Sequence, residues 1–334
     1  MRIAVIGSGA IGCLVAGYLK EKGEEVTLIG RSPAVKEISK NGIIITGVRG
    51  NFSVRLDAAD SLNFIPDLVI LATKTQDIDS ALKNNAPLMR SSLFLTTQNG
   101  LQADKIAAKY LSPEQIISSI VMFGSTNLES GKVVHNFEGS WILGSLYGSY
   151  SSQSLLSLSP VLNKAFPVVI SQDILGMKYL KIFVNANNCL PAILGKSMQE
   201  IFSDLTVSRM SIAIWKEALG VFSKIGLKPV SLPGFPVENI TRFIAMPALQ
   251  AAEIFSGMMK GLSKEPLYGS VLQSIMRGKL SEIDYLNGEF VRLAEENNLT
   301  APLNKALVEM VHQVEMNRRF FSKEELIQKT KELI

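Results

Sequence analysis

The sequence contains few of the residues that enzymes use for metal binding or nucleophilic catalysis. Its 334 residues include two cysteines and two histidines. Cys13 and Cys189 lie in apolar helical segments, so we expect buried free thiols in a reducing compartment rather than a disulfide. His135 and His312 have no clustered polar residues beside them, and we expect structural or surface roles for both. Neither a metal centre nor a histidine-based dehydrogenase is therefore predicted.

Long apolar runs and dense basic runs are also missing. No stretch approaches the ~20 apolar residues of a membrane span. Regular structure is expected from Arg2, which leaves no room for a signal peptide. The net charge is only +4, without the basic and aromatic clusters typical of nucleic-acid binding. We expect a cytoplasmic protein that binds a small molecule, with no membrane or nucleic-acid partner.

The composition indicates a globular protein of two domains. Hydrophobic residues make up 47% of the chain and charged residues 19%, which provides a large core, and the length exceeds one ordinary core. Strand-like runs stop near Val169, and segments from about Leu175 have helical periodicity. We predict an α/β Rossmann-type domain over residues 1–170 and an all-α domain with substrate and catalytic residues over 171–334. A homodimer is compatible with this organisation, since any helix face of the second half could form its interface.

The amino-terminal segment carries a dinucleotide-binding motif. An apolar strand over residues 3–6 precedes the G-x-G-x-x-G sequence, and a helix and a second strand over 26–29 follow. This order is the context that the motif requires. Its residues, all predicted to contact a cofactor, are Gly7, Ser8, Gly9, Ala10, Ile11 and Gly12. The first glycine permits a tight turn, the second lets the backbone approach a pyrophosphate, and the third lets helix and strand pack closely. A glycine turn without a ligand is the alternative.

The end of the second strand favours NADP(H) over NAD(H). NAD-binding units usually place Asp or Glu there to hold the ribose hydroxyls. This sequence has Arg31 instead, followed by Ser32, and no acid before Glu37. A guanidinium can bind a 2′-phosphate in bidentate fashion, whereas a carboxylate would repel it. The alternative is a solvated charge at the strand end.

Two further apolar strands end in polar residues. Residues 68–73 are followed by Lys74 to Asp77, and residues 93–97 by Gln98, Asn99 and Gly100. Open α/β sheets bind ligands at the carboxyl ends of their strands. We therefore expect ligand contacts from these two segments.

The helical half contains an unusual polar stripe. Lys181, Asn185 and Asn188 are spaced i, i+4, i+7 in a helix predicted over residues 175–190, so they should share one face. Asn is a poor residue inside helices, and a buried amide without a hydrogen bond is costly. The stripe suggests a face turned toward a polar ligand, and a solvated stripe is the alternative.

A second polar stretch lies near the carboxyl end. Ser281 and Asp284 approximate a capping box for a helix predicted over residues 282–297, which would place Glu282 in its first turn. An acid in that position is favourable because of the helix macrodipole alone.

Together these motifs resemble the ketopantoate reductase family (2-dehydropantoate 2-reductases). The resemblance extends over nearly the whole chain, and its most specific element is S-x-L-Q followed by E-I-D-x-x-N-G, from Ser270 to Gly288. It implies a carboxyl-terminal helical domain like that of 6-phosphogluconate dehydrogenase. It also implies NADPH-dependent reduction of 2-oxopantoate to (R)-pantoate, on the route to pantothenate and coenzyme A.

The resemblance also implies roles for individual residues. Lys181 would be the catalytic lysine that donates a proton or hydrogen bond to the ketone oxygen, and Glu282 the carboxylate that orients the site. Asn185, Asn188, Asn99 and Ser270 would bind the substrate, with Ser270 on its carboxylate. Further cofactor contacts would come from Arg31, Lys74, Asn99 and Glu282.

The chain departs from the family pattern around the expected substrate pocket. Cys189 stands where the family has a second Asn, unless one residue is deleted and Asn188 takes its place. Met198 replaces an Asn, and Leu267 and Gly269 replace residues that are often Asn and Ser. Two alternatives therefore remain: an NADPH-dependent reductase of another branched or polar 2-oxo acid, and a catalytically silent NADP(H)-binding sensor. The sensor would need neither Lys181 nor Glu282.

Overall fold

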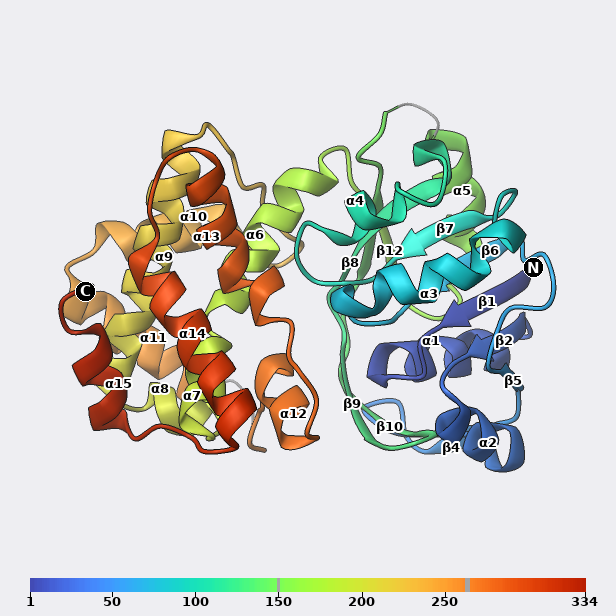
Figure 1. The fold of residues 1–334 in the computed structure, drawn as a ribbon, viewed down its shortest axis with the longest axis horizontal. Helices are drawn as coiled ribbons and strands as arrows, with labels where there is room; N and C mark the ends of the chain where they lie inside the picture. The colour runs from blue at the N-terminus through green and yellow to red at the C-terminus, as the bar shows by residue number, and fades with distance from the viewer. Residues whose placement is uncertain (149–150, 262–264) are drawn as a thin grey trace. The chain divides into compact units, whose positions relative to one another are not determined.

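The computed structural model describes residues 1–148, 151–261 and 265–334. The chain divides into two compact units, Met1–Leu175 and Gly176–Ile334. In Figure 1 the strands belong to the blue-to-green unit, whereas the yellow-to-red part of the chain is helical. The predicted fold class, a Rossmann-type α/β unit followed by a helical unit, is confirmed. Among the described residues, no helix is both long enough and apolar enough to cross a membrane.

The first unit is built on an eight-stranded sheet with the order β12-β11-β8-β7-β6-β1-β2-β5. Every neighbouring pair is parallel except β8 and β11. The central strands are continuous apolar runs because helices cover both faces of such a sheet. The strands are β1 (Arg2–Ile6), β2 (Glu25–Ile29), β5 (Asp57–Ala59), β6 (Leu68–Leu71), β7 (Leu93–Thr96), β8 (Ile116–Val121), β11 (Trp141–Gly144) and β12 (Val168–Ile170).

The helices of this unit connect the strands of the sheet. They are α1 (Ala10–Glu21), α2 (Ser32–Asn41), α3 (Ile78–Asn85), α4 (Ala103–Ala107) and α5 (Ser151–Leu162), with the 3-10 turns η1 (Thr75–Asp77), η2 (Ala86–Leu88) and η3 (Pro113–Gln115). Because β2 and β6 both pair with β1 in parallel, the carboxyl ends of all three strands meet at one edge.

A second sheet of four strands covers α1. Its order is β4-β3-β10-β9, with the strands β3 (Ile43–Gly47), β4 (Phe52–Val54), β9 (Gly124–Glu129) and β10 (Lys132–Phe137). Strands β3 and β4 form an antiparallel hairpin. Helix α1 contacts strands of both sheets, and its residues from Gly12 to Leu19 are all buried. A helix that is apolar on every side is typical of such a sandwiched position.

His135 belongs to the packing of this layer. Its ring is fully buried on β10, its Nδ1 lies 2.9 Å from the hydroxyl oxygen of Tyr18, and burial lowers its pKa. The ring also packs edge-to-face against Phe123 and Phe166. These contacts fit the structural role expected for this histidine.

The second unit is a set of helices. They are α6 (Ile174–Ala186), α7 (Cys189–Leu194), α8 (Met198–Phe202), α9 (Leu205–Lys224), α10 (Val237–Ala245), α11 (Ala248–Lys260), α12 (Ser270–Met276), α13 (Asn287–Glu296), α14 (Pro302–Asn317) and α15 (Lys323–Thr330), with the 3-10 turn η4 (Ile283–Tyr285) before α13. Helix α11 packs along α9, and α14 packs against α7 and α13.

A helix predicted as continuous is divided in the structure. The helix expected over residues 175–190 stops at Ala186 and restarts at Cys189. Pro191 lies in the first turn of the new helix, where its missing N–H is tolerated; in one continuous helix its ring would clash with the carbonyl of Asn187. Another proline marks the break between α10 and α11, where Pro247 is the N-cap of α11.

Candidate active site

The glycine loop has the close packing that its motif predicts. Gly7 has φ +121°, and a Cβ there would lie 2.5 Å from the carbonyl carbon of Ala72 after β6. A Cβ at Gly12 would lie 1.8 Å from the carbonyl oxygen of Gly7. Both glycines are therefore required by the backbone itself. Around Gly9, by contrast, a Cβ would meet nothing within 4 Å.

The amino terminus of α1 is suited to a phosphate. Gly9 is its N-cap and provides no side-chain cap, and no acidic residue lies in the first turn. The first N–H groups of a helix lack partners within the helix and carry the positive end of its dipole. Together with the open space at Gly9, this is a cradle that the pyrophosphate of a dinucleotide fits. Ser8, Ala10 and Ile11 form the rest of the loop.

The second strand ends directly beside this loop. A Cβ at Gly30 would lie 2.8 Å from Oγ of Ser8. Arg31 follows as the N-cap of α2, and its Nη2 donates to Oδ1 of Asp77 at 2.9 Å. Sequence reasoning missed this pair because the partners are separated by more than forty residues and meet only through the sheet order.

Gln98, in a segment expected to contact the ligand, joins the carboxyl ends of β6 and β7 through hydrogen bonds that the sequence did not predict. Nε2 of Gln98 donates to the carbonyl oxygens of Leu71 and Thr73, at 3.0 and 2.9 Å. The Thr73 hydroxyl oxygen is buried without a hydrogen-bond partner, and the Thr73 amide nitrogen would lie 2.7 Å from a Cβ of Gly7. Such a hydroxyl beside the glycine loop fits a polar ligand group. Lys74 and Asn99 follow these strand ends as expected, and both are partly buried.

In the second unit, Lys181 and Asn185 lie one turn apart on α6 and are partly buried. Burial lowers the pKa of Lys181 from 10.5 to about 8, because an ammonium loses hydration more expensively than a neutral amine. A lysine with this pKa can give up a proton near neutral pH.

Asn188 does not belong to the same helix as Lys181. It is the N-cap of α7, and Asn188 N donates to the carbonyl oxygen of Asn185 at 2.9 Å. The prediction of one continuous helical face through Asn188 is therefore wrong, because α6 ends at Ala186 and the next helix begins only at Cys189. Both side-chain polar atoms of Asn187 are buried without a partner.

Cys189, where the family has an Asn, does not present a polar group to solvent. It is fully buried, burial raises the pKa of its thiol to about 12, and Nδ2 of Asn287 lies 3.7 Å from its Sγ. Asn287 Nδ2 also donates to Oδ1 of Asn304. Cys189 is thus part of the packing between α7, α13 and α14.

The other departures from the family pattern lie close to Asn188. An ideal Cβ at Gly269 would lie 2.7 Å from Oδ1 of Asn188 and 3.1 Å from Cε of Met198. Met198 N also donates to the carbonyl oxygen of Leu267. Gly269 is the N-cap of α12, whose first residue, Ser270, is exposed. The structure therefore brings Asn188 to the segment that carries Ser270.

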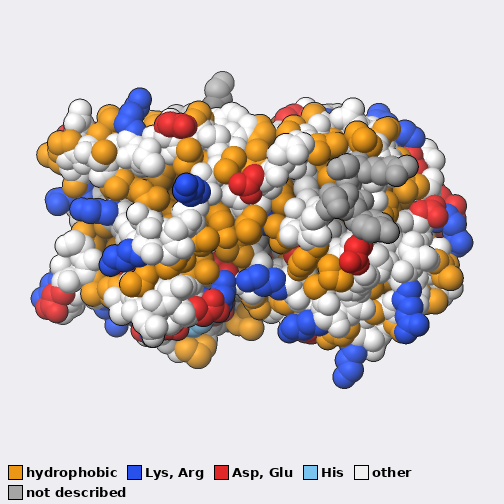
Figure 2. Space-filling model, turned by 90° about the horizontal axis from the view of Figure 1, so that it is seen from above, with side chains coloured by type: hydrophobic (Ala, Val, Ile, Leu, Met, Phe, Trp, Pro, Cys, Tyr) orange, Lys and Arg blue, Asp and Glu red, His pale blue; other side chains and the backbone are white. Residues whose placement is uncertain are grey.

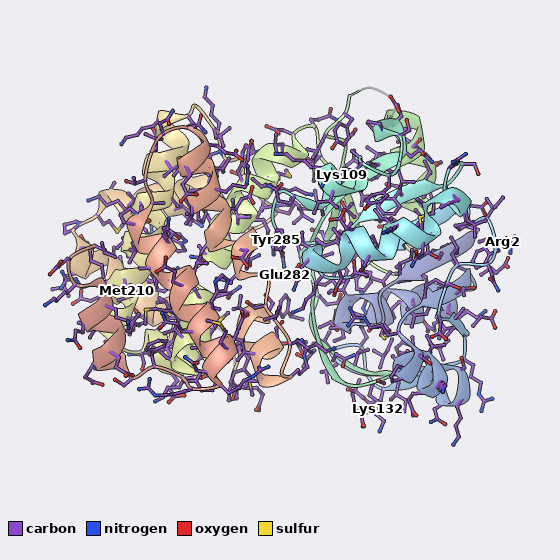
Figure 3. All side chains as sticks on the ribbon, viewed as in Figure 1. Arg2, Lys109, Lys132, Met210, Glu282 and Tyr285 are labelled. Carbon is purple, nitrogen blue, oxygen red and sulfur yellow. The ribbon has the colours of Figure 1, made fainter. Side chains whose placement is uncertain are left out.

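Glu282 is not in the first turn of a long helix, as the capping-box pattern predicted. It is the N-cap of η4, and α13 begins only at Asn287 because Leu286 has non-helical dihedral angles, φ −118° and ψ −93°. The Ser281 hydroxyl accepts from Ile283 N at 3.3 Å, which closes a turn too short for the predicted box. Figure 3 shows Glu282 and Tyr285 in this segment before α13.

Charges of both signs are distributed over the surface. On the face shown in Figure 2, basic side chains lie scattered among acidic ones without forming one continuous stripe. Within the described ranges, no group of three or more His, Cys, Asp or Glu side chains is arranged to hold a metal ion.

Two family models match the chain. The one described as "Ketopantoate reductase PanE/ApbA" covers residues 3–148, and its "C terminal" counterpart covers residues 173–315. Among curated proteins, the 2-dehydropantoate 2-reductase of Pyrococcus horikoshii is 31% identical over 93% of this chain and 96% of its own length. The enzyme of the same name from Lactococcus lactis is 27% identical over 98% and 99%.

Solved structures share the fold. A ternary structure of D-mandelate dehydrogenase with NADH and anilino(oxo)acetate superposes with a TM-score of 0.82 at 23% identity, over 95% of this chain and 99% of that one. A PanE/ApbA family ketopantoate reductase from Ralstonia eutropha gives a TM-score of 0.79 at 24% identity, with the same coverage.

Proposed function

The chain belongs to the ketopantoate reductase family, and from this premise we propose that it reduces 2-oxopantoate to (R)-pantoate with NADPH. The resemblance noted in the sequence is thereby confirmed. Members of the family are oxidoreductases that act on CH–OH and C=O groups with a nicotinamide cofactor, and this chain is one of them. The particular 2-oxo acid and the choice of NADPH are our proposals.

The observation that carries the proposed chemistry is the partial burial of Lys181, together with its lowered pKa. Its ammonium is partly buried on α6 and has a pKa of about 8. Reduction of a ketone puts negative charge on the carbonyl oxygen. A positioned ammonium stabilises that charge, and one with a pKa near 8 can also transfer its proton to the oxygen.

The dinucleotide would supply a hydride for C2 of the substrate. The chain would hold its pyrophosphate with the N–H groups that begin α1, above Gly9. Arg31 would bind the 2′-phosphate at the end of β2. Ser8, Ala10, Ile11, Lys74 and Asn99 would complete the contacts.

The substrate would be held by the second unit. Ser270 at the start of α12 would bind the carboxylate, and Asn185 and Asn188 would bind polar groups with their amides. Asn99 is proposed as a further substrate contact. Glu282 would orient these groups and contact the cofactor.

A second candidate is the reduction of another 2-oxo acid. It is favoured by the residues near Ser270. Met198 and Leu267 are apolar there, and Gly269 has no side chain. The burial of Cys189 in the interior removes a further polar group. A substrate with fewer hydroxyl groups than 2-oxopantoate would suit such surroundings.

Steady-state assays with a panel of 2-oxo acids test these readings. The panel comprises 2-oxopantoate, 2-oxoisovalerate, 2-oxoisocaproate and phenylglyoxylate, each with NADPH and with NADH. The highest kcat/KM on 2-oxopantoate supports the proposal, and a markedly higher value on another acid selects the second candidate. Binding of NADPH without oxidation by any of these acids would contradict both and support a sensor.

A further inference from the structure

Arg31, the residue expected to bind the 2′-phosphate, already has an acidic partner. Nη2 of Arg31 donates to Oδ1 of Asp77 at 2.9 Å, and the two side chains are 80% and 38% exposed. Arg31 follows β2, whereas Asp77 ends η1 after β6. Both side chains are therefore accessible to a ligand.

The sheet order explains why the two residues meet. Strands β2 and β6 flank β1, and Ile6 is in register with Ile29 on one side and Leu71 on the other. Neighbouring strands lie ~5 Å apart, so the two strand ends are ~10 Å from each other. The pair must therefore reach across the end of β1, where the glycine loop begins.

This arrangement supplies the acid that the second strand lacks. In NAD-binding units, an Asp or Glu at the end of the second strand accepts the ribose 2′-hydroxyl. Here that position is Arg31, and a carboxylate reaches the same place from a different strand. One spot thus offers a cation for a 2′-phosphate and an acceptor for a 2′-hydroxyl.

The two groups have opposite effects on the two coenzymes. A 2′-phosphate must displace Asp77 from Arg31, or share the guanidinium with it while the two anions repel each other. A 2′-hydroxyl is neutral and can donate to the carboxylate without breaking the ion pair. The carboxylate therefore lowers affinity for NADPH and raises affinity for NADH.

We propose that Asp77 determines coenzyme specificity: it competes with the 2′-phosphate for Arg31, accepts the 2′-hydroxyl of NADH, and so allows the protein to use both coenzymes. The inference rests on the proposed placement of a dinucleotide at the glycine loop.

The test is a direct titration of the whole chain with NADPH and with NADH. Binding is monitored through the fluorescence of the coenzyme, and no 2-oxo acid is present. The wild type is expected to bind both. Because exposed ion pairs contribute little, Asp77→Asn should tighten NADPH binding by roughly 2- to 5-fold. Asp77→Ala, which removes the acceptor, should weaken NADH by a similar factor. The gain for NADPH should shrink as salt is raised, since the interaction is between exposed charges.

The matched control is Asp79→Asn. Asp79 lies two positions further along the chain, and its Oδ1 accepts from the Tyr110 hydroxyl instead of Arg31. Asp79→Asn should leave the ratio of the NADPH and NADH dissociation constants unchanged. Equal changes for both coenzymes in the Asp77 variants, or none, would overturn the inference and leave the proposed function standing. A wild type that binds neither coenzyme would overturn both.

Discussion

Oδ1 of Asn188 lies 2.7 Å from the point that a Cβ of residue 269 would occupy. Position 269 has glycine here, and the amide of Asn188 lies against its backbone. The Asn188 amide at the start of α7 therefore occupies its position because residue 269, at the start of α12, has no side chain.

Gly269→Ala is expected to displace the Asn188 amide. Because Asn188 is proposed to bind the substrate, KM for the 2-oxo acid should rise by ~2- to 10-fold, the value of one hydrogen bond. The dissociation constant of NADPH should not change. Steady-state kinetics and NADPH titration measure the two effects.

Gly257→Ala on α11 is the control for this change, since a Cβ there meets nothing within 4 Å. Adding Gly269→Ala to Asn188→Ala should raise KM little beyond the value for Asn188→Ala alone, because the amide with which the new Cβ would collide is no longer present. Additive losses in the double variant would argue against this coupling.

Two glycines of the loop should respond differently to alanine. Gly12→Ala forces a Cβ to within 1.8 Å of the Gly7 carbonyl oxygen and should lower the free energy of unfolding by about 1–3 kcal/mol, the usual cost of overpacking. Gly9→Ala adds a methyl group to open space, so stability should be unchanged while dinucleotide binding weakens by ~10-fold or more through lost charge-assisted contacts. Denaturant unfolding and coenzyme titration distinguish them. Normal coenzyme affinity in Gly9→Ala would move the pyrophosphate away from this loop.

Lys181→Ala should lower kcat by ~10²- to 10⁴-fold, the usual effect of losing a general acid. NADPH binding should be preserved. The comparison variant is Lys216→Ala, which removes an exposed lysine from α9. If Lys181→Ala turned over at the wild-type rate, Lys181 would have no place in the mechanism.

The rate of ketone reduction should fall as pH rises through about 8. Burial lowers the pKa of Lys181 to about 8, so the ammonium that serves as acid is present below that pH and is lost above it. The reverse oxidation needs the neutral amine and should instead rise over the same range. Profiles of kcat/KM against pH in both directions measure this, with Lys181→Arg as the comparison, because arginine keeps its proton throughout. A reduction rate that stays level up to pH 10 would contradict the assignment.

Arg31→Ala should weaken NADPH by ~10- to 100-fold, corresponding to about 1.5–3 kcal/mol for a charge-assisted contact, and should spare NADH. Isothermal titration with each coenzyme gives both constants. Arg55→Ala, at an exposed arginine between β4 and β5, controls for the loss of surface charge. An equal loss for the two coenzymes would refute a contact with the 2′-phosphate.

The sequence by itself determined the features that depend on local pattern. The apolar strands, the glycine loop and the helical second half follow from hydrophobic periodicity and from the steric needs of Gly7 and Gly12. The family could be recognised for the same reason, since its motifs are short and continuous.

Tertiary structure alone decided the relationships between distant segments. Asp77 reaches Arg31 because β2 and β6 flank β1, and Asn188 reaches Gly269 because α7 packs against α12. The break at Asn187 and the short turn at Glu282 also escaped prediction, because periodicity does not show where a helix restarts. Local backbone preferences are written in neighbouring residues, whereas contacts across a sheet or between helices depend on how the whole unit packs.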